Sequence, residues 1–479
     1  MSRNYKERIK SIVLFILLIA SVMQAGMLWN NIDHSFPFYY IAAHFSNAQK
    51  QLATDSALQE IPDGVQIALN PYKISVCDGE ETHYIVPRKS ETFTRLLETN
   101  IQFYEEILSD NGIKELALEE WGNLVSRKSF LVEFKVPLQQ DVIKWAIDLY
   151  NNTSTAPNEI QKLLITLNEG IDGQVVRLFV LTPNKIIQYH SKTVRFDFMQ
   201  QLFTECVNDI ESDSLNIAQY KTIGEFGGSG FPGFNSDVLC VIEGQKSKMF
   251  RKLKYAVPSD IRDKAELENT ILGDDIHSYN RALDFSNTLV FKNITSIYRL
   301  YKDGLLEYNY TPVVQINEKG AMTKSLANTL HYVQNIETNL LGSADLYLSG
   351  ISEDPSGLTY RFTFDYILDD CPVLFQYTQK QGEAANEYRN AITIQANESR
   401  IISCRWLFVD LYFGTDIQKM QMYFETIDIG ESLTKLSIKD INVAYNININ
   451  QYNNNSSIWP VWMLESADGE IKTVPMREG

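Results

Sequence analysis

The residue types that most often perform catalysis are scattered in this chain. The six histidines stand at positions 34, 44, 83, 190, 277 and 331, and no two have the spacing with which one helix holds a metal ion. The nearest match to the Gly-x-Ser-x-Gly turn of serine hydrolases is GGSGF at 227–231. There Ser229 would be the nucleophile, but Phe231 takes the place of the second glycine. We therefore expect no catalytic residue and no metal site.

Three pairs of neighbouring carboxylates are the remaining candidates for acid–base chemistry: Asp274–Asp275, Glu353–Asp354 and Asp369–Asp370. A glycosidase needs two carboxyl groups about 5–10 Å apart across a sugar, one of them with a raised pKa. Adjacent acidic residues are more typical of turns that face solvent, and none of the pairs has the EF-hand spacing. We interpret all three pairs as turns.

The glycine-rich run GEFGGSGFPGF at 224–234 could offer backbone N–H groups to a phosphate. It lacks the Gly-Lys-Ser/Thr ending of a P-loop, and Pro232 removes one donor. We interpret it as a boundary loop and expect no cofactor.

The cysteines exclude the common metal and redox motifs. They stand at 77, 206, 240, 371 and 404, so no Cys-x-x-Cys pair exists and neither a zinc ribbon nor a thioredoxin motif is present. We expect mostly buried thiols in strands, and a single disulfide remains an alternative.

The amino-acid composition excludes further classes of protein. The chain has 479 residues, enough for about three domains, and its 43 Lys and Arg against 60 Asp and Glu give a net charge of −17. A nucleic-acid binder needs a basic face that displaces counterions from phosphate, and this balance does not supply one. The mean hydropathy of −0.20 excludes a protein with many membrane spans.

One segment at the N-terminus is long and apolar enough to cross a bilayer. Residues 11–29 read SIVLFILLIASVMQAGMLW, and a helix of that length spans roughly 28 Å, close to the ~30 Å hydrocarbon core. The basic residues Arg3, Lys6, Arg8 and Lys10 precede it, which predicts a cytoplasmic N-terminus and an extracytoplasmic remainder. The protein is thus expected in the cell membrane, with a single span. A cleaved signal peptide is the alternative.

The same segment has one face suited to contact with another membrane helix. Ser21 and Ala25 form a small-xxx-small pair, and Gln24 would seek a polar partner in hydrocarbon. The predicted contact face comprises Leu14, Leu17, Ser21, Gln24, Ala25 and Leu28. A passive anchor that tolerates one glutamine near its outer end is the alternative.

Beyond the anchor, helices alternate with short strands joined by tight turns. This pattern predicts an α+β fold with mainly antiparallel sheets and packed helices. The expected helices lie within 36–58, at 91–108, 197–209, 323–340 and 416–427, and near 432–436. The expected strands are 65–76, 84–87, 130–136, 175–181, 185–189, 238–243, 289–291, 296–301, 305–310, 344–349, 358–368, 391–395, 401–413, 442–449, 459–465 and 471–474.

The domain organisation follows from these patterns. We expect a basic flank and anchor at 1–29, an N-terminal extracytoplasmic α+β domain at 30–212, a middle α+β domain at 213–318 and a C-terminal α+β domain at 319–479. The asparagine-rich stretch 446–455 is interpreted as an exposed loop.

Three segments resemble the YycH (WalH) family of Firmicute signalling regulators. The opening KERIKSIVLFILLIASVMQAGMLW at 6–29 is similar to the family's basic flank and membrane helix with its outer tryptophan. LVFKNITSIYRLYKDGLLEYN at 289–309 resembles the strands and turn of its middle domain. IWPVWMLE at 458–465, followed by DGEIKTV, is similar to the strand pair that ends YycH and its relative YycI. The asparagine-rich region departs from the family pattern.

This resemblance implies a non-enzymatic protein. Members of the family associate, together with YycI, with the sensor histidine kinase WalK (YycG), and they tune its activity and thereby cell-wall metabolism. The family's membrane helix is an implied contact, whereas activation and inhibition of the kinase both remain open. The alternative from another class is an exported, cell-wall-associated binding or hydrolytic protein.

Overall fold

The computed structural model describes most of the chain beyond its N-terminal segment. The described residues are 69–110, 112–147, 157–170, 173–212, 218–225, 234–244, 247–257, 264–284, 288–311, 320–337, 344–355, 357–378, 386–422, 437–449 and 457–479. All of them belong to one compact unit, residues 61–479. Within these described ranges no helix is long and apolar enough to cross a bilayer. The segment 11–29 lies outside them, so the membrane anchor stays a prediction.

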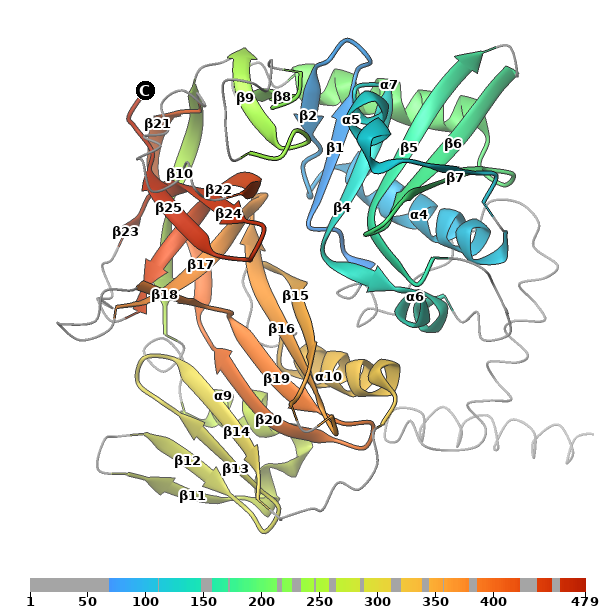
Figure 1. Cartoon of the computed structure of the whole chain (residues 1–479). Coiled ribbons are helices and arrows are strands. Elements are labelled where there is room, and N and C mark those ends of the chain that lie inside the picture. The colour runs from blue at the N-terminus through green and yellow to red at the C-terminus, as the bar shows by residue number, and fades with distance from the viewer. Residues whose placement is uncertain are drawn as a thin grey trace, which may run out of the picture. The chain divides into compact units, whose positions relative to one another are not determined.

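The first sheet is antiparallel, with the order β3-β7-β6-β5-β4-β1-β2-β8-β9 among the described strands (Figure 1). Its strands are β1 (Lys73–Cys77), β2 (His83–Ile85), β3 (Lys114–Leu116), β4 (Ser129–Gln139), β5 (Glu159–Gly170), β6 (Gly173–Leu181), β7 (Ile186–His190), β8 (Ala218–Thr222) and β9 (Leu239–Gly244). The long strands β4, β5 and β6 lie near the centre of this sheet.

Two long helices pack on one face of the first sheet. Helix α4 (Glu91–Ser109) begins at Ser90, whose hydroxyl accepts a hydrogen bond from the Phe93 N–H at 3.1 Å. Its apolar stripe packs in the same core as helix α7 (Phe196–Ser212). The short α6 (Gln140–Ala146) lies beside α4. Helix α5 (Trp121–Val125) belongs to a separate small core around Trp121 and Phe179, and the 3₁₀ turn η1 (Leu118–Glu120), which buries no residue, precedes it.

The large sheet follows the path β11-β12-β13-β14-β20-β19-β16-β17-β22-β24-β25, while β15 pairs with β16 and β18 with β17. Its strands are β11 (Asn280–Leu283), β12 (Leu289–Lys292), β13 (Ser296–Leu300), β14 (Leu305–Tyr310), β15 (Asp345–Glu353), β16 (Tyr360–Leu368), β17 (Cys371–Thr378), β18 (Asn386–Arg389), β19 (Ile392–Ala396), β20 (Ile401–Leu407), β22 (Ile438–Asn448), β24 (Pro460–Ser466) and β25 (Ile471–Pro475). Strands β17 and β22 pair in parallel. Helix α10 (Met322–Glu337) buries Leu326, Leu330 and Val333 in the core of this sheet.

A small sheet has the order β21-β10-β23 and joins distant parts of the chain. Strand β10 (Ser247–Ala256) pairs along nearly its whole length with β21 (Asp410–Gln421), and β23 (Ser457–Ile458) lies on its other side. The remaining described helical elements, α9 (Lys264–Leu272) and the 3₁₀ turn η2 (Gly273–Ser278), connect β10 to β11.

The α+β class with mainly antiparallel sheets is confirmed, as are the helices expected at 91–108 and 197–209. The helix expected at 416–427 is wrong where the structure describes it, because residues 416–421 continue β21. Pairing with β10 outweighs the local helix preference of that segment. Asn446 and Asn448, expected in a loop, lie in β22.

Candidate functional site

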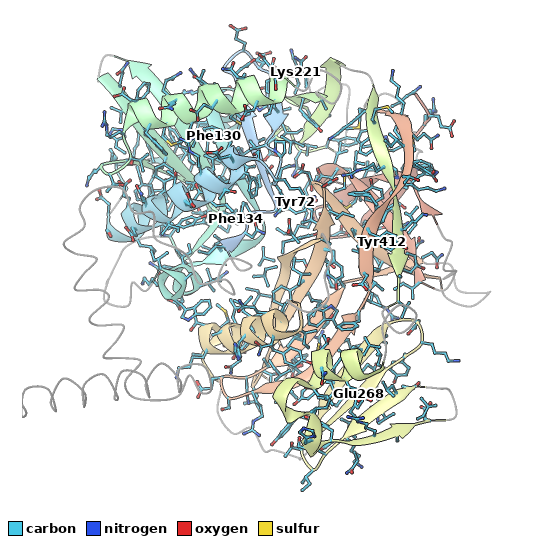
Figure 2. The ribbon with its side chains drawn as sticks, turned by 180° about the vertical axis from the view of Figure 1, so that it is seen from behind. Tyr72, Phe130, Phe134, Lys221, Glu268 and Tyr412 are labelled. Atoms are coloured by element: carbon cyan, nitrogen blue, oxygen red, sulfur yellow. The ribbon has the colours of Figure 1, made fainter. Side chains whose placement is uncertain are left out.

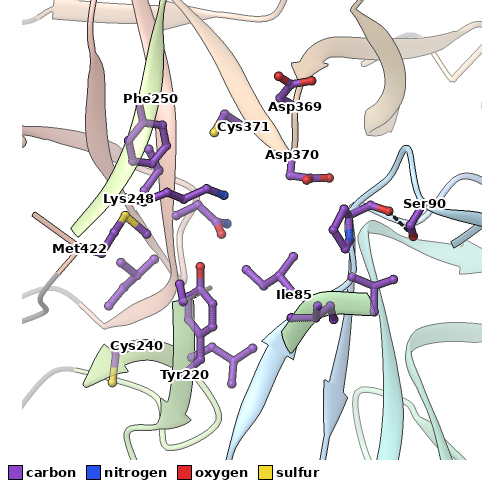
Figure 3. Close-up of a pocket in the computed structure, with 18 of the residues that line it drawn as sticks. Ile85, Ser90, Tyr220, Cys240, Lys248, Phe250, Asp369, Asp370, Cys371 and Met422 are labelled. Atoms are coloured by element: carbon purple, nitrogen blue, oxygen red, sulfur yellow. Dashed lines mark hydrogen bonds between the residues drawn. The ribbon is translucent and has the colours of Figure 1, made fainter. Parts of the chain in front are cut away.

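A cavity of about 280 Å³ lies where the first sheet meets strands of the other two sheets. The ends of β2 and α4, together with α7, β8 and β9, provide one wall. The opposite wall comes from β10, the turn between β16 and β17, β22 and β24 (Figure 3). Much of the lining is apolar, with Ile85, Phe250, Met422, Ile441 and Trp462 among its residues. Since these elements are far apart in sequence, the cavity exists only in the folded unit.

Asp369 and Asp370 form the turn at the rim of this cavity. They connect Leu368 of β16 to Cys371 of β17, which pair directly, so the hairpin has a two-residue loop. Their φ angles are 45° and 64°, the left-handed conformation that a type I′ turn requires at both positions. Gly and Asn adopt it most easily, and two aspartates there store strain. The predicted turn is confirmed, although its carboxylates face partners in the protein.

The two carboxylates have different environments. Asp369 accepts a hydrogen bond from Lys89 Nζ at 2.7 Å and forms an ion pair with Arg251. Partial burial would raise the pKa of Asp369, but these two cations outweigh it and hold the pKa below its ordinary value. Asp370 accepts a bond from the backbone N–H of Arg88 at 2.8 Å. Burial raises the pKa of Asp370, against the effects of that N–H and of Lys248.

Three of the cysteines line the cavity, but their thiols are not activated. Burial raises the pKa of Cys206, Cys240 and Cys371 to about 12 in each case. A nucleophilic cysteine needs a lowered pKa, so none of these thiols suits nucleophilic chemistry. All five cysteines of the chain are buried and free, which confirms the expectation of buried thiols.

One cation at the cavity has no acceptor or counter-ion among the described residues. The ammonium of Lys248 lies 5.7 Å from the centre of the Phe250 ring, and no described residue forms an ion pair or hydrogen bond with it. Trp462 also lines the cavity, but its Nε1–H is fully enclosed by protein and so does not open into the space; this N–H has no partner in the described part of the protein. The hydroxyl of Tyr220 points into the same space (Figure 3).

A separate buried cluster joins His83, Glu225 and Ser126. The Glu225 carboxylate lies 3.1 Å from His83 Nε2, receives the Ser126 hydroxyl, and accepts the Thr222 N–H at 2.7 Å. Burial would raise the pKa of Glu225, but these bonds lower it to about 2. In a hydrolase the histidine contacts the serine directly, whereas here the carboxylate separates them. The cluster therefore ties the end of β8 to β2 and α5.

A third group, which we call the charge seam, comprises Lys73, Glu133, Lys162, Asp237 and Asp440. Glu133 of β4 lies 3.3 Å from Lys73 of β1 and 2.8 Å from Lys162 of β5. Asp440 of β22 is 3.2 Å from Lys73, and Asp237 is 2.9 Å from Lys162. Burial would raise the pKa of Glu133, but the two lysines lower it to about 2. The seam joins the first sheet to β22 of the large sheet.

Tyr72, which Figure 2 labels, directly precedes Lys73 of the charge seam and adds further contacts between the sheets. Its ring packs on Tyr347 at 5.4 Å between centroids, and Lys135 lies 4.6 Å from its centre. Its hydroxyl accepts a hydrogen bond of 2.7 Å from Asn442. Lys135 also forms an ion pair with Glu465 of β24. The first sheet is thus joined to β22, β24 and β15 by aromatic and charged contacts.

The residues predicted for partner contact, Leu14, Leu17, Ser21, Gln24, Ala25 and Leu28, lie outside the described residues, as does Ser229. Among the residues that the structure describes, no group of three or more His, Cys, Asp or Glu could hold a metal ion. Lys248, Tyr220 and Trp462 went unnoticed in the sequence. No local motif identifies them, because β10, β8 and β24 meet only through tertiary pairing.

The fold defines a class: an α+β protein whose mainly antiparallel sheets belong to one compact unit. No family model and no curated protein matches the chain. Among solved structures it is similar to YycH from Bacillus subtilis, with a TM-score of 0.52 and 12% sequence identity, over 88% of this chain and 99% of that chain. An uncharacterized protein from Eubacterium rectale matches at a TM-score of 0.27 and 13% identity, over 51% and 86%. The chain therefore has a YycH-like fold.

Proposed function

We propose that this chain is a membrane-anchored regulator of a two-component sensor histidine kinase of the WalK (YycG) type, and that it thereby controls cell-wall metabolism. The observation that carries the proposal is the YycH-like fold, which extends over nearly all of the solved YycH chain. The resemblance of the segments 6–29, 289–309 and 458–465 to the YycH family supports it from the sequence. The proposed partners are the kinase and a YycI-like protein.

The proposed mechanism is protein contact without catalysis. The segment 11–29 would anchor the chain in the cell membrane, with the N-terminus cytoplasmic and the described unit outside. A helix that packs better against one state of the kinase shifts its equilibrium by the difference in affinity for the two states. The described unit would add contacts outside the membrane.

The test compares two faces of the anchor in the full-length chain. One variant carries Ser21→Leu, Gln24→Leu and Ala25→Leu, which removes the small and polar residues of the predicted face. Its matched control carries Ile12→Leu, Ile19→Leu and Met23→Leu, which a helical period places on the opposite face. The chain would be captured from cross-linked membranes, and the amounts of kinase and of YycI-like protein bound to it would be measured. A reporter for a cell-wall gene would measure kinase output.

We expect the first variant to lose kinase capture about tenfold or more and to uncouple the reporter, while the control keeps both. Equal capture by both variants would remove the helix from the mechanism and assign recognition to the exported unit. If the native chain captures neither a histidine kinase nor a YycI-like protein, the proposed function is wrong.

An exported, wall-associated binding or hydrolytic protein is the second candidate, because the cavity has acidic residues at its rim. Hydrolysis would need one of these carboxylates free to attack or to activate water. Asp369 is instead held by Lys89 and Arg251, which favours binding over hydrolysis. Release of soluble fragments from purified cell wall by the full-length chain would support hydrolysis, and no release would count against it.

A further inference from the structure

The described residues separate into two groups by the cores in which they pack. Residues 69–212, which we call the N-terminal lobe, bury their apolar side chains in two cores of their own. Residues 218–479, the C-terminal lobe, share the large core, to which the segment of β8 and β9 contributes Val238 and Cys240. The N-terminal lobe adds one buried side chain to that core, Val142 of α6. Each lobe therefore has a core that does not depend on the other lobe.

Little backbone joins the two lobes. The chain passes between them once, from Ser212 at the end of α7 to Ala218 at the start of β8. Within the first sheet, β2 pairs with β8 through His83 and Tyr220 alone, whereas β8 and β9 pair over five residues. The strand pairing of the first sheet is thus shortest at the point where the lobes meet.

Many contacts across this boundary are ion pairs, and their charges are arranged by lobe. Four lysines of the N-terminal lobe pair with carboxylates of the C-terminal lobe: Lys73 with Asp440, Lys89 with Asp369, Lys135 with Glu465 and Lys162 with Asp237. The pair of Lys221 and Glu81 has the opposite arrangement. Water solvates both members of an ion pair once they part, which offsets much of the lost attraction. A boundary of this kind therefore opens at a lower cost than an apolar core.

The cavity of about 280 Å³ lies on the same boundary. Its lining includes Ile85, Ser90 and Cys206 from the N-terminal lobe and faces Phe250 and Cys371 from the C-terminal lobe (Figure 3). Side chains that line an unfilled space lose the dispersion contacts that close packing provides. The lobes are therefore held together less strongly here than the strands within either core.

We propose that the two lobes open and close about the connection between α7 and β8, and that ion pairs across the boundary hold them closed. In the open state the walls of the cavity meet solvent, while each lobe keeps its own core. Interfaces between domains of one chain are expected to permit relative motion unless they are large and apolar. A partner that binds one of the two states better shifts the equilibrium towards that state. The inference goes beyond the proposed regulation of a kinase and does not depend on it.

The buried cysteines allow a test in the full-length chain, purified in mild detergent. Cys206 and Cys371 line the cavity from opposite lobes, whereas Cys404 is buried in the core of the C-terminal lobe. Iodoacetamide labels accessible thiols, and mass spectrometry measures the rate at each cysteine, divided by its rate in denaturant. We expect Cys206 and Cys371 to react at least about tenfold faster than Cys404, because opening exposes the cavity and unfolding is needed to expose the core.

Asp440→Asn changes the boundary without touching the cavity. It removes the carboxylate that lies 3.2 Å from Lys73 across the boundary, and Asp440 does not line the cavity. Because one opening exposes both walls, the labelling of Cys206 and Cys371 should increase by the same factor, about tenfold. Circular dichroism checks that the variant is folded.

The matched control is Glu268→Gln, which breaks a pair within the C-terminal lobe. Glu268 is 4% exposed and lies 2.8 Å from Arg281, away from the cavity lining (Figure 2). Opening leaves this pair intact, whereas unfolding of the lobe breaks it. The control should therefore accelerate the labelling of Cys404 and leave Cys206 and Cys371 nearly unchanged.

Equal normalised rates at Cys206, Cys371 and Cys404 would overturn the proposal, because unfolding of the whole unit would then be what exposes the cavity. The proposal would also fail if folded Asp440→Asn left both cavity cysteines unchanged, or if it accelerated only one of them. Kinase capture by the anchor variants is a separate measurement, so failure of the lobe opening and failure of the proposed function are distinguishable.

Discussion

The charge seam and the cavity lie where the same sheets meet, yet their lysines have different surroundings. In the seam, Lys73 and Lys162 each have two carboxylate partners between 2.8 and 3.3 Å. In the cavity, Lys248 has no ion-pair partner among the described residues, and the adjoining turn places Asp370 at a φ of 64°. Both regions contain lysines and carboxylates, so residue type alone does not distinguish them.

This difference between the two regions distinguishes a structural role from a functional one. A buried charge is tolerated when its partners replace water, and the seam meets that condition. Backbone held in a left-handed conformation at non-glycine residues costs stability, and such strain clusters at sites that serve binding or catalysis. On this basis the seam is structural and the cavity is the functional candidate.

Glu133→Gln should destabilise the unit most. Glu133 is the carboxylate that both lysines of the seam share, and its loss leaves two buried ammonium groups with one partner each. Breaking a buried ion pair by removing one partner costs about 3–5 kcal/mol, and the remaining Asp237 and Asp440 should hold the loss near the lower value. Denaturant unfolding of the full-length chain, followed by circular dichroism, measures the change.

The control is Glu115→Gln, which removes an ion pair with Lys185 on the surface of the first sheet. Glu115 is 65% exposed, so solvent already screens this pair and its loss should leave the unfolding midpoint nearly unchanged. If both substitutions reduce stability equally, burial is not what makes the seam important, and the comparison with the cavity loses its basis.

Glu225→Gln should have an intermediate effect that depends on pH. The pKa of Glu225 falls from 4.5 to about 2 in the folded protein, so its contribution is complete above pH 4.5 and is lost as the pH falls towards 2. At pH 7 we expect a loss of about 1–2 kcal/mol in the free energy of unfolding, because a carboxylate that accepts several buried bonds becomes an amide.

Unfolding experiments at several pH values check the direction of this pH dependence. The difference between native protein and Glu225→Gln should shrink between pH 4.5 and 2, the range given by the pKa shift. A difference that grows on acidification would mean that the His83–Glu225–Ser126 cluster is not held by the ionised carboxylate.

Local features of the fold were predictable from the sequence. The apolar stripe of 91–108 after Ser90 identifies α4, and the Lys-Asp-Gly turn at 302–304 identifies the hairpin of β13 and β14, in which Gly304 has a φ of 83°. Both depend on residues close together in the chain. Asp369–Asp370 was likewise identified as a turn, for the same reason.

Features that depend on distant pairing were not predictable. Strand β21 pairs with β10 from a remote part of the chain, and its last residues, 416–421, have a local pattern that favours a helix. The cavity depends even more on distant segments, because four separate parts of the chain contribute its residues Ile85, Lys248, Asp370 and Trp462. A single sequence contains no signal that brings these residues together, so the missing partner of Lys248 is visible only in the structure.

Of these substitutions, Asp370→Asn should change the free energy of unfolding least, and it should raise this free energy where the others lower it. Asn adopts the left-handed conformation at least as well as Asp and can still accept the Arg88 N–H, so the turn is kept. Burial raises the pKa of Asp370 above its ordinary value of 3.8, which means that the ionised form reduces stability once the pH exceeds that value. Asn removes this charge and should stabilise the unit by less than about 1 kcal/mol at pH 7, with no gain below pH 3.

The matched control is Asp303→Asn in the exposed turn between β13 and β14, where the carboxylate accepts the Leu305 N–H at 3.2 Å and does not line the cavity. Unfolding of both variants at pH 3 and pH 7 gives the comparison. A loss of stability in Asp370→Asn at pH 7 would mean that Asp370 serves as the counter-ion of Lys248. The charges of the cavity would then be balanced within the protein, as they are in the charge seam, and the contrast between the two regions would fail.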